Sequence, residues 1–257
     1  MTQLDDGAPL IVAIANQKGG VGKSTTSINL SAGLALQGER VLMVDLDPQG
    51  NATSGLGIDR GAIELSIYDV LLKSAEIQDA VEPTAIRDLF VVPATIDLAG
   101  AEIELVSVFS REQRLRTALE TVSDDFDFVI IDCPPSLGLL TVNAMAAAHE
   151  LLIPIQCEYY ALEGLSQLLS NVDMVRSNLN RGLELGGVVL TMYDGRTNLA
   201  KDVRQQVNDF FGEKAYRTLI PRSVRLSEAP SYGAVSYTHL TLPTSSVMGG
   251  GGGGGGG

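Results

Sequence analysis

The chain has 257 residues, of which 45% are hydrophobic, and its formal net charge is −13. This is enough apolar material for the core of one large α/β domain, whereas so negative a charge excludes a surface coated uniformly by nucleic acid. The N-terminus is acidic and no stretch approaches the roughly 20 apolar residues of a membrane span, so we expect neither a signal peptide nor a membrane segment. Cys133 and Cys157 lack metal-ligand spacing and are interpreted as small core residues.

A glycine-rich loop follows the first predicted strand. Residues 10–15 are apolar, residues 24–36 have a helical pattern, and Lys-Gly-Gly-Val-Gly-Lys-Ser-Thr lies between them at 18–25. The glycines let backbone N–H groups turn toward phosphate oxygens, and the helix N-terminus adds partial positive charge. Lys23 can reach the β- and γ-phosphates of a nucleotide, and the Ser24 hydroxyl can ligate Mg²⁺. The sequence therefore predicts a phosphate-binding loop formed by Gly19, Gly20, Val21, Gly22, Lys23, Ser24 and Thr25.

Strands and helices alternate along the rest of the chain. Apolar runs indicate further strands at 40–46, 89–92, 126–131, 150–155, 185–192 and 216–220, and helical patterns occur at 66–72, 76–81, 96–108, 112–122, 139–148, 162–179 and 199–211. This order predicts a doubly wound, mostly parallel β-sheet with helices on both faces, the P-loop NTPase type of α/β fold. Since no repeat or linker is visible, we expect one ATPase-type domain at 10–234 after a short tail at 1–9.

Carboxylates stand at the ends of two predicted strands. Asp45 and Asp47 belong to Asp-Leu-Asp-Pro-Gln-Gly-Asn after the strand at 40–46, and Asp132 ends the strand at 126–131. Ligands of doubly wound sheets bind outside the carboxyl ends of the strands, so these are candidate metal and water-positioning groups. Asp132 follows four apolar residues in the manner of a Walker B motif and is expected to hold Mg²⁺ through a water.

The loop departs from the usual Gly-x-x-x-x-Gly-Lys-Ser/Thr spacing, because Gln17 replaces the first glycine and a second lysine, Lys18, follows it. This loop, the Asp-Pro-Gln-Gly-Asn segment and the segments 191–197 and 220–231 resemble the ParA/MinD superfamily of deviant Walker A ATPases, and within it the chromosomal ParA (Soj-type) partitioning proteins. The resemblance spans roughly residues 10–233. It implies an ATP hydrolase for chromosome or plasmid segregation that uses ATP and Mg²⁺ in the cytoplasm, on the nucleoid. It also implies an ATP-dependent homodimer that binds double-stranded DNA non-specifically, and a ParB-type centromere-binding partner that stimulates hydrolysis.

The resemblance also implies roles for single residues. Lys18 would cross the dimer interface to the partner's nucleotide, and the segment 158–164 would lie near that interface. Asp47 would orient the attacking water, and Asp45 would support the metal. The remaining roles are catalysis for Lys23, contact with the adenine base for Pro221 and Ser223, and contact with DNA phosphates for Arg196 and Arg225. The window 194–225 holds seven basic and four acidic side chains, which suits a local DNA-binding face.

Three alternatives remain. An orphan relative would use the same machinery to position a protein cargo on the nucleoid. A MinD-like membrane switch would need a basic amphipathic C-terminal helix, and the sequence gives no reason to expect a membrane partner. An electron-transfer protein like the nitrogenase iron protein would need cluster cysteines, for which Cys133 and Cys157 are poorly placed.

From about residue 235 the pattern breaks down. Val-Ser-Tyr-Thr-His-Leu at 235–240 matches what a common sequencing adapter encodes, and nine glycines end the chain. We interpret 235–257 as a non-native tail and expect the last helix of the domain to be missing, with apolar surface left exposed in its place.

Overall fold

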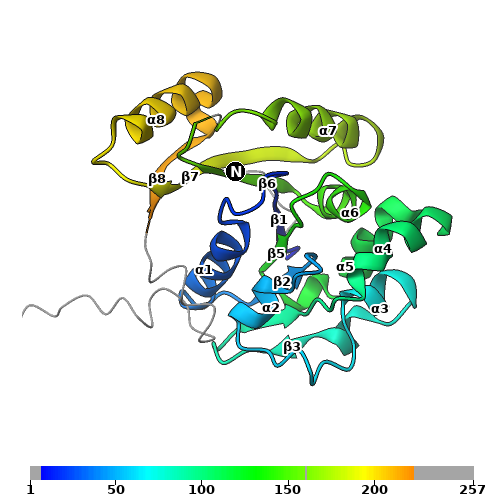
Figure 1. Cartoon of the computed structure of the whole chain (residues 1–257). Helices are drawn as coiled ribbons and strands as arrows, with labels where there is room; N and C mark the ends of the chain where they lie inside the picture. Colours follow the sequence, from blue (N-terminus) through cyan, green and yellow to red (C-terminus); the bar gives the residue numbers. More distant parts are fainter. Residues whose placement is uncertain (1–6, 160, 223–257) are drawn as a thin grey trace, which may run out of the picture.

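One eight-stranded sheet runs through the computed structural model, which describes residues 7–159 and 161–222 (Figure 1). The strands are β1 (Leu10–Ile14), β2 (Val41–Asp45), β3 (Glu82–Pro83), β4 (Leu89–Val92), β5 (Phe128–Asp132), β6 (Glu150–Gln156), β7 (Glu184–Tyr193) and β8 (Ala215–Pro221). Their order is β3-β4-β2-β5-β1-β6-β7-β8. The β3–β4 pair is antiparallel and every other neighbouring pair is parallel, so the carboxyl ends of the parallel strands meet at one edge.

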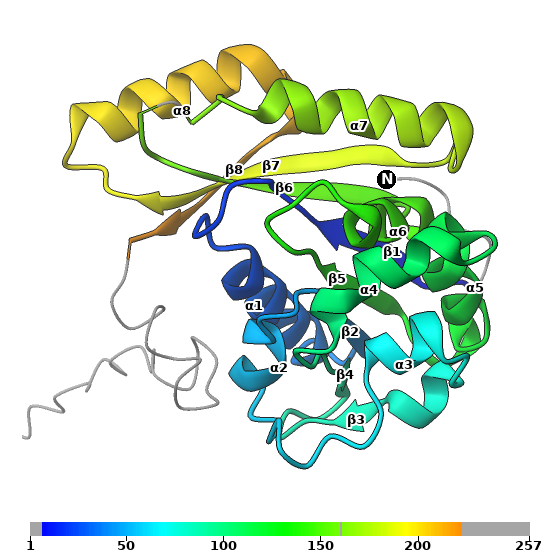
Figure 2. The ribbon, with the colours of Figure 1, turned by 45° about the vertical axis from the view of Figure 1, so that its right-hand side comes forward.

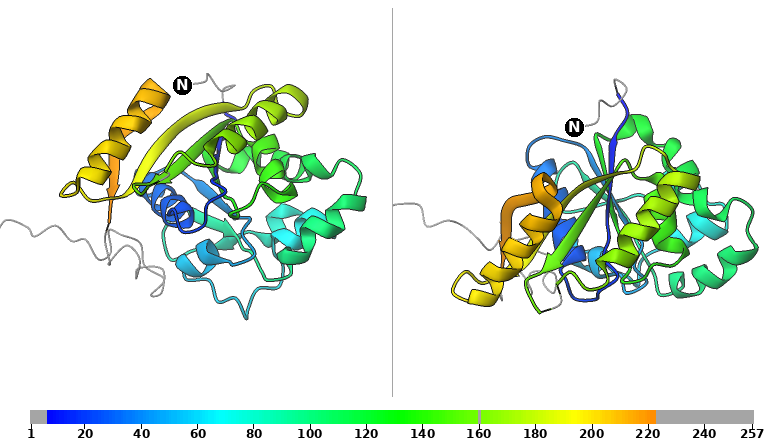
Figure 3. Two further views of the ribbon diagram at one scale, coloured as in Figure 1. Left: turned by 45° about the horizontal axis from the view of Figure 1, so that its top comes forward. Right: turned by 90° about the horizontal axis from the view of Figure 1, so that it is seen from above.

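Helices cover both faces of this sheet (Figures 2 and 3). They are α1 (Lys23–Ala35), α2 (Asn51–Gly55), α3 (Ile67–Leu72), α4 (Leu98–Glu104), α5 (Arg114–Glu120), α6 (Leu139–Ala147), α7 (Leu165–Asn178) and α8 (Asn198–Phe211). Short 3₁₀ turns are η1 (Ile77–Ala80), η2 (Leu105–Ser107), η3 (Arg111–Gln113), η4 (Ser123–Asp125) and η5 (Gly212–Lys214). Helices α1 and α2 contribute to the smaller of two apolar clusters, and α3 to α8 contribute to the larger one.

The central strands are apolar on both sides because both sides are covered. In β2, Leu42 and Val44 belong to the larger cluster while Met43 belongs to the smaller one, and all three are fully buried. Parallel strands in such sheets form continuous apolar runs rather than alternating ones. This explains why strand positions could be predicted from the sequence, and the predicted doubly wound fold is confirmed.

Several local expectations were wrong. Residues 51–55, where no helix was expected, form α2, and the two-residue β3 was not expected either. The helix expected from 162 begins at Leu165, because Gly164 adopts φ +81° immediately before it. The helix expected at 96–108 is split into α4 and η2. The interpretation of residues 235–257 concerns a segment that lies outside the described residues.

No helix in the described ranges is both long enough and apolar enough to cross a membrane. Cys133 and Cys157 are buried with free thiols, and burial raises the pKa of Cys157 to about 11. Within residues 7–159 and 161–222, no group of three or more His, Cys, Asp and Glu side chains is arranged to hold a metal by itself.

Candidate functional site

The loop between β1 and α1 is held by polar contacts on both sides. Asn16 Nδ2 donates to Pro154 O at 2.8 Å, and Asn16 Oδ1 accepts from the Lys18 N–H at 3.0 Å. On the β7 side, Thr191 Oγ1 donates to Val21 O at 2.8 Å. Gly20 and Gly22 have φ of +73° and +87°, in the left-handed region that glycine adopts without strain. The loop is therefore shaped by the protein's own contacts.

Lys23 opens α1 and is buried beneath this loop. Lys23 is only 6% exposed, and its Nζ donates a hydrogen bond to Lys18 O at 3.1 Å. Burial lowers the pKa of Lys23, and the nearby charge of Asp132 opposes that shift. No described side chain caps the N-terminus of α1, so its first N–H groups are available for an anion.

Asp45 and Asp132 lie side by side beneath the loop, because they are register partners on β2 and β5. Both are fully buried. The Thr53 N–H and hydroxyl donate to Asp45 Oδ2 at 2.8 and 2.7 Å, and Ser27 Oγ donates to Asp132 Oδ1 at 2.9 Å. No described group donates to Asp132 Oδ2, although this oxygen is buried.

Burial makes the two carboxylates weak acids. It raises the pKa of Asp45 to about 6, against the opposing effect of the hydrogen bonds from Thr53. Burial, reinforced by the charge of Asp45, raises the pKa of Asp132 to about 7, while the hydrogen bond from Ser27 acts in the other direction. Two adjacent buried carboxylates with an unpartnered oxygen are unfavourable when both are ionised, and a divalent cation would relieve this.

A cavity of about 550 Å³ is lined by residues of the phosphate loop and of the segment that follows β2. Asp47 is 6% exposed and lies on its wall. The other described lining residues are Gly19, Gly20, Gly22, Lys23, Ser24, Thr25, Ile28, Gln49, Asn51, Ser54, Pro135 and Met192. Its volume is within the range of small-molecule sites, and its donor set fits a polyphosphate with a divalent cation. The structure therefore brings the predicted loop and Asp47 together on one cavity. The fully buried Asp45 and Asp132 are not among its described lining residues, and Asp132 is joined to α1 through Ser27.

Lys18 extends to a different neighbourhood. Its Nζ lies 3.7 Å from Glu158 Oε2, and Glu158 Oε1 lies 3.6 Å from Arg222 Nη2. Lys18 also lines a second cavity of about 590 Å³ beside Tyr159 and Glu163. Within its own chain, Lys18 therefore pairs with Glu158 rather than with the buried carboxylates.

Of the remaining predicted residues, Arg196 lies between β7 and α8 and Pro221 lies at the end of β8. Arg196 forms two side-chain hydrogen bonds with Asp194, Nε to Oδ1 at 2.8 Å and Nη2 to Oδ2 at 2.6 Å, and these bonds lower the pKa of Asp194 to about 2. Pro221 ends β8 and is not among the described residues that line the loop cavity. Ser223 and Arg225 lie outside the described residues.

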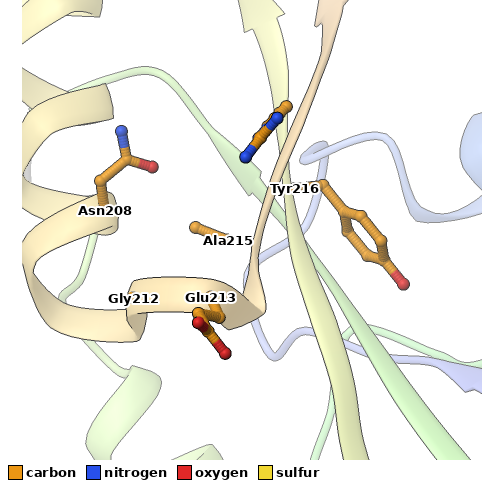
Figure 4. A pocket seen from close by; sticks show the side chains of 6 residues that line it. Asn208, Gly212, Glu213, Ala215 and Tyr216 are labelled. Carbon is orange, nitrogen blue, oxygen red and sulfur yellow. The ribbon is translucent and has the colours of Figure 1, made fainter. Parts of the chain in front are cut away.

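A third cavity is lined by residues of α8, η5 and β8, and Figure 4 shows Asn208 on α8 and Tyr216 projecting from β8 away from that helix. Its volume is about 610 Å³, slightly larger than that of the loop cavity. The described lining residues are Asn208, Gly212, Glu213, Ala215, Tyr216 and Arg217. These groups include no buried acid and no cluster of donors, so size alone does not identify the site.

Sequence reasoning missed Ser27, Thr53 and Thr191. Ser27 and Thr53 are fully buried polar residues that hold the two carboxylates, and Thr191 ties the loop to β7. Ser27 carries a usable signal, because a serine one turn after Lys23 lies on the face of α1 that meets β5. Thr53 carries none, since its importance depends on α2, which was not expected.

Comparisons with known proteins agree with this geometry. A family model described as an AAA domain matches residues 10–185. The sporulation initiation inhibitor protein Soj of Bacillus subtilis is 60% identical over 87% of this chain and 88% of its own length. The chromosome partitioning protein ParA of Myxococcus xanthus is 56% identical over 87% of this chain and 79% of its own length.

Solved structures with a similar fold include nucleotide complexes. Cobyrinic acid a,c-diamide synthase from Mycobacterium smegmatis, with bound ADP and magnesium, has a TM-score of 0.80 at 42% identity and covers 88% of this chain and 92% of that chain. An ATP complex of a Cyanothece McdA variant has a TM-score of 0.83 at 25% identity and covers 92% of each chain. With its phosphate loop, its paired strand-end carboxylates and these relatives, the chain belongs to the ParA/Soj family of chromosome-partitioning ATPases.

Proposed function

We propose that this chain is an ATP-driven switch that segregates a chromosome or plasmid by binding DNA. In this proposal ATP and Mg²⁺ bind at the β1–α1 loop, two ATP-loaded subunits form a homodimer, and the dimer binds double-stranded DNA without sequence preference. A ParB-type partner stimulates ATP hydrolysis, and hydrolysis releases the protein from nucleoid DNA. The protein acts in the cytoplasm. The observation that carries the proposal is the preformed phosphate loop and its helix α1, which contacts Asp132, the buried register partner of Asp45.

The contacts around the loop support the proposed roles in nucleotide binding. Gly19, Gly20, Val21, Gly22 and Thr25 offer backbone N–H groups to the phosphates, and the Lys23 ammonium adds a fixed positive charge. Ser24, Asp132 and Asp45 would hold the magnesium ion, and the unpartnered Asp132 Oδ2 supports this assignment. When bound, the ion neutralises charge on the phosphate oxygens. Pro221 and Ser223 are proposed contacts of the adenine base.

Asp47 is the proposed water-orienting group. One of its oxygens accepts from the Gln49 N–H at 2.9 Å, which fixes the carboxylate on the cavity wall. A carboxylate held in this way can align a water for attack on a phosphoryl group. Lys18 is proposed to leave Glu158 and act on the partner's nucleotide, since a flexible lysine is adequate as a point charge.

DNA contact is proposed for Arg196 and Arg225. The side chain of Arg196 is 89% exposed. It belongs to the segment 194–225, which contains more basic than acidic residues. Phosphate contacts of this kind give binding that weakens steeply with salt and is independent of sequence.

The test is retention of the full chain on random-sequence DNA with ATP, with ADP and without nucleotide, across a salt titration. We expect retention with ATP only, with loss in Lys18→Ala and a lower salt midpoint in Arg196→Ala. Arg87→Ala is the matched control, because Arg87 is similarly exposed and also pairs with a neighbouring aspartate, Asp88. Equal retention in all nucleotide states would overturn the proposal, as would an equal effect of the control.

A further inference from the structure

The α4–η2 segment is apolar on two sides. Leu98, Ala101 and Leu105 point into the core and are fully buried. On its outer side, Ile103 is 79% exposed and Val106 59%, and they lie three residues apart on one helical face. Ile96 before the helix and Phe109 after it are also exposed. We call these four residues the outer ridge. Figure 1 shows α4 at the margin of the molecule, on the opposite side from α8.

Exposed apolar side chains that gather on one short segment are typical of an interaction surface. A core helix needs only one apolar face, which here is supplied by Leu98, Ala101 and Leu105. The isoleucine, valine and phenylalanine on the outer side contribute nothing to that core. Phe109, at 94% exposed, is the extreme case.

The charges around the outer ridge indicate what it binds. Asp97 and Glu104 are exposed beside the ridge, whereas Glu102 faces Gly138 and Glu112 pairs with Arg111, the single basic residue of 96–113. The Arg111 guanidinium is already engaged, since it donates to Val106 O and to Glu112 Oε1, both at 2.8 Å. The surface is therefore apolar with an acidic border, which complements an apolar side chain flanked by lysine or arginine.

Two connections join this segment to the nucleotide site. The Glu102 carboxylate packs so closely on Gly138 that a Cβ there would overlap it, and Gly138 immediately precedes α6 in the connection that follows Asp132. Glu102 Oε1 is buried and has no donor among the described residues, so this contact is not locked by a hydrogen bond. At the other end, Ala94, four residues before α4, donates its N–H to Thr53 Oγ1 at 2.9 Å, and Thr53 holds Asp45.

We propose that the outer ridge is the docking surface for a partner-protein segment that presents an apolar side chain flanked by basic residues. Docking there acts on the nucleotide site through Glu102 and Gly138, and through Ala94 and Thr53. The inference rests on the proposed function, because it assigns a place to the partner that stimulates hydrolysis.

The test compares the double variant Ile103→Ser/Phe109→Ser with the control Met174→Ser/Phe210→Ser. The control side chains are 60% and 63% exposed and lie on α7 and α8. The probe is a purified ParB-type protein, titrated into ATP hydrolysis assays with DNA present. We expect basal hydrolysis and ATP-dependent DNA retention to be unchanged in both variants. We expect the concentration for half-maximal stimulation to rise about tenfold or more in the ridge variant only.

A charge variant checks the chemistry of the partner. Asp97→Lys is expected to weaken stimulation in the same assay, whereas Asp173→Lys on α7 is expected to leave it unchanged. Equal stimulation of the ridge variant and the unmodified chain overturns the inference. Loss of the ATP-dependent dimer in the ridge variant, measured by sedimentation, also overturns it and assigns the ridge to a second copy of the chain. If the unmodified chain shows no ATP-dependent DNA retention or no stimulation, the proposed function itself fails.

Discussion

Replacing Thr53 by valine would remove one hydroxyl from beneath the nucleotide site while keeping the shape of the side chain. Thr53 is fully buried, and its hydroxyl both donates to Asp45 Oδ2 and accepts the Ala94 N–H, at 2.7 and 2.9 Å. Valine can make neither bond. The Thr53 backbone N–H still reaches Asp45, so the carboxylate keeps part of its support.

The expected cost follows from these two bonds. A hydrogen bond to a charged group contributes about 1.5–3 kcal/mol, and a buried N–H left without an acceptor costs about 1–3 kcal/mol. The added methyl group recovers about 1 kcal/mol by burial. We therefore expect Thr53→Val to lower the free energy of unfolding by about 3 kcal/mol. Thr53→Ser keeps both bonds and loses one buried methyl, so it is expected to cost about 1 kcal/mol.

The assay is urea unfolding followed by far-UV circular dichroism at pH 8 without nucleotide, with the slope of each transition compared between variants. A Thr53→Val protein that is as stable as Thr53→Ser would refute the reasoning. That result would mean that neither bond contributes to the stability of the sheet edge that carries the carboxylates.

Three further predictions concern groups around the site. Glu158→Gln releases Lys18 from a half-exposed ion pair that contributes about 0.5 kcal/mol in each subunit. Since the dimer contains two such pairs, ATP-dependent dimerisation measured by sedimentation should strengthen about fivefold, and weaker dimerisation would contradict this. Asp194→Asn frees Arg196 and removes a negative charge, so the salt midpoint of DNA retention should rise, and an unchanged midpoint would count against the role of Arg196. Burial lowers the pKa of His149 below 6.5, and its neutral Nδ1 accepts a β1 backbone N–H. The native state thus binds fewer protons than the unfolded state, and stability should fall as the pH drops below about 6.5. In His149→Phe, urea midpoints at pH 7.5 and 5.5 should differ less than in the unmodified chain; an equal difference would show that His149 is not responsible.

The parts of the fold that could be predicted from the sequence are those in which one local signal decides the structure. The central strands are apolar because two helical layers bury them, and the phosphate loop is defined by glycines whose φ values only glycine adopts easily. Asp45 and Asp132 could be predicted as site residues for a similar reason. Both end predicted strands, and parallel strands align their carboxyl ends at one edge of the sheet.

The parts that could not be predicted depend on contacts between distant segments. Helix α2 has only five residues, too few for a visible period, and it is positioned by Thr53 bonding to Asp45 and Ala94. Strand β3 consists of a glutamate and a proline, which carry no strand signal and pair only because β4 is beside them. The pairing of Arg196 with Asp194 likewise depends on the turn before α8, not on a pattern.

The sheet ends at β8, whose outer row of backbone N–H and C=O groups has no strand partner among residues 7–159 and 161–222. Such an edge can recruit a strand from another molecule and so begin aggregation. Three features of β8 oppose this: exposed Arg217, terminal Pro221, and two register shifts against β7 that keep the strand irregular. The charge of Arg217, the missing N–H of Pro221 and the irregular register of β8 therefore disfavour pairing of this edge with a strand of another molecule.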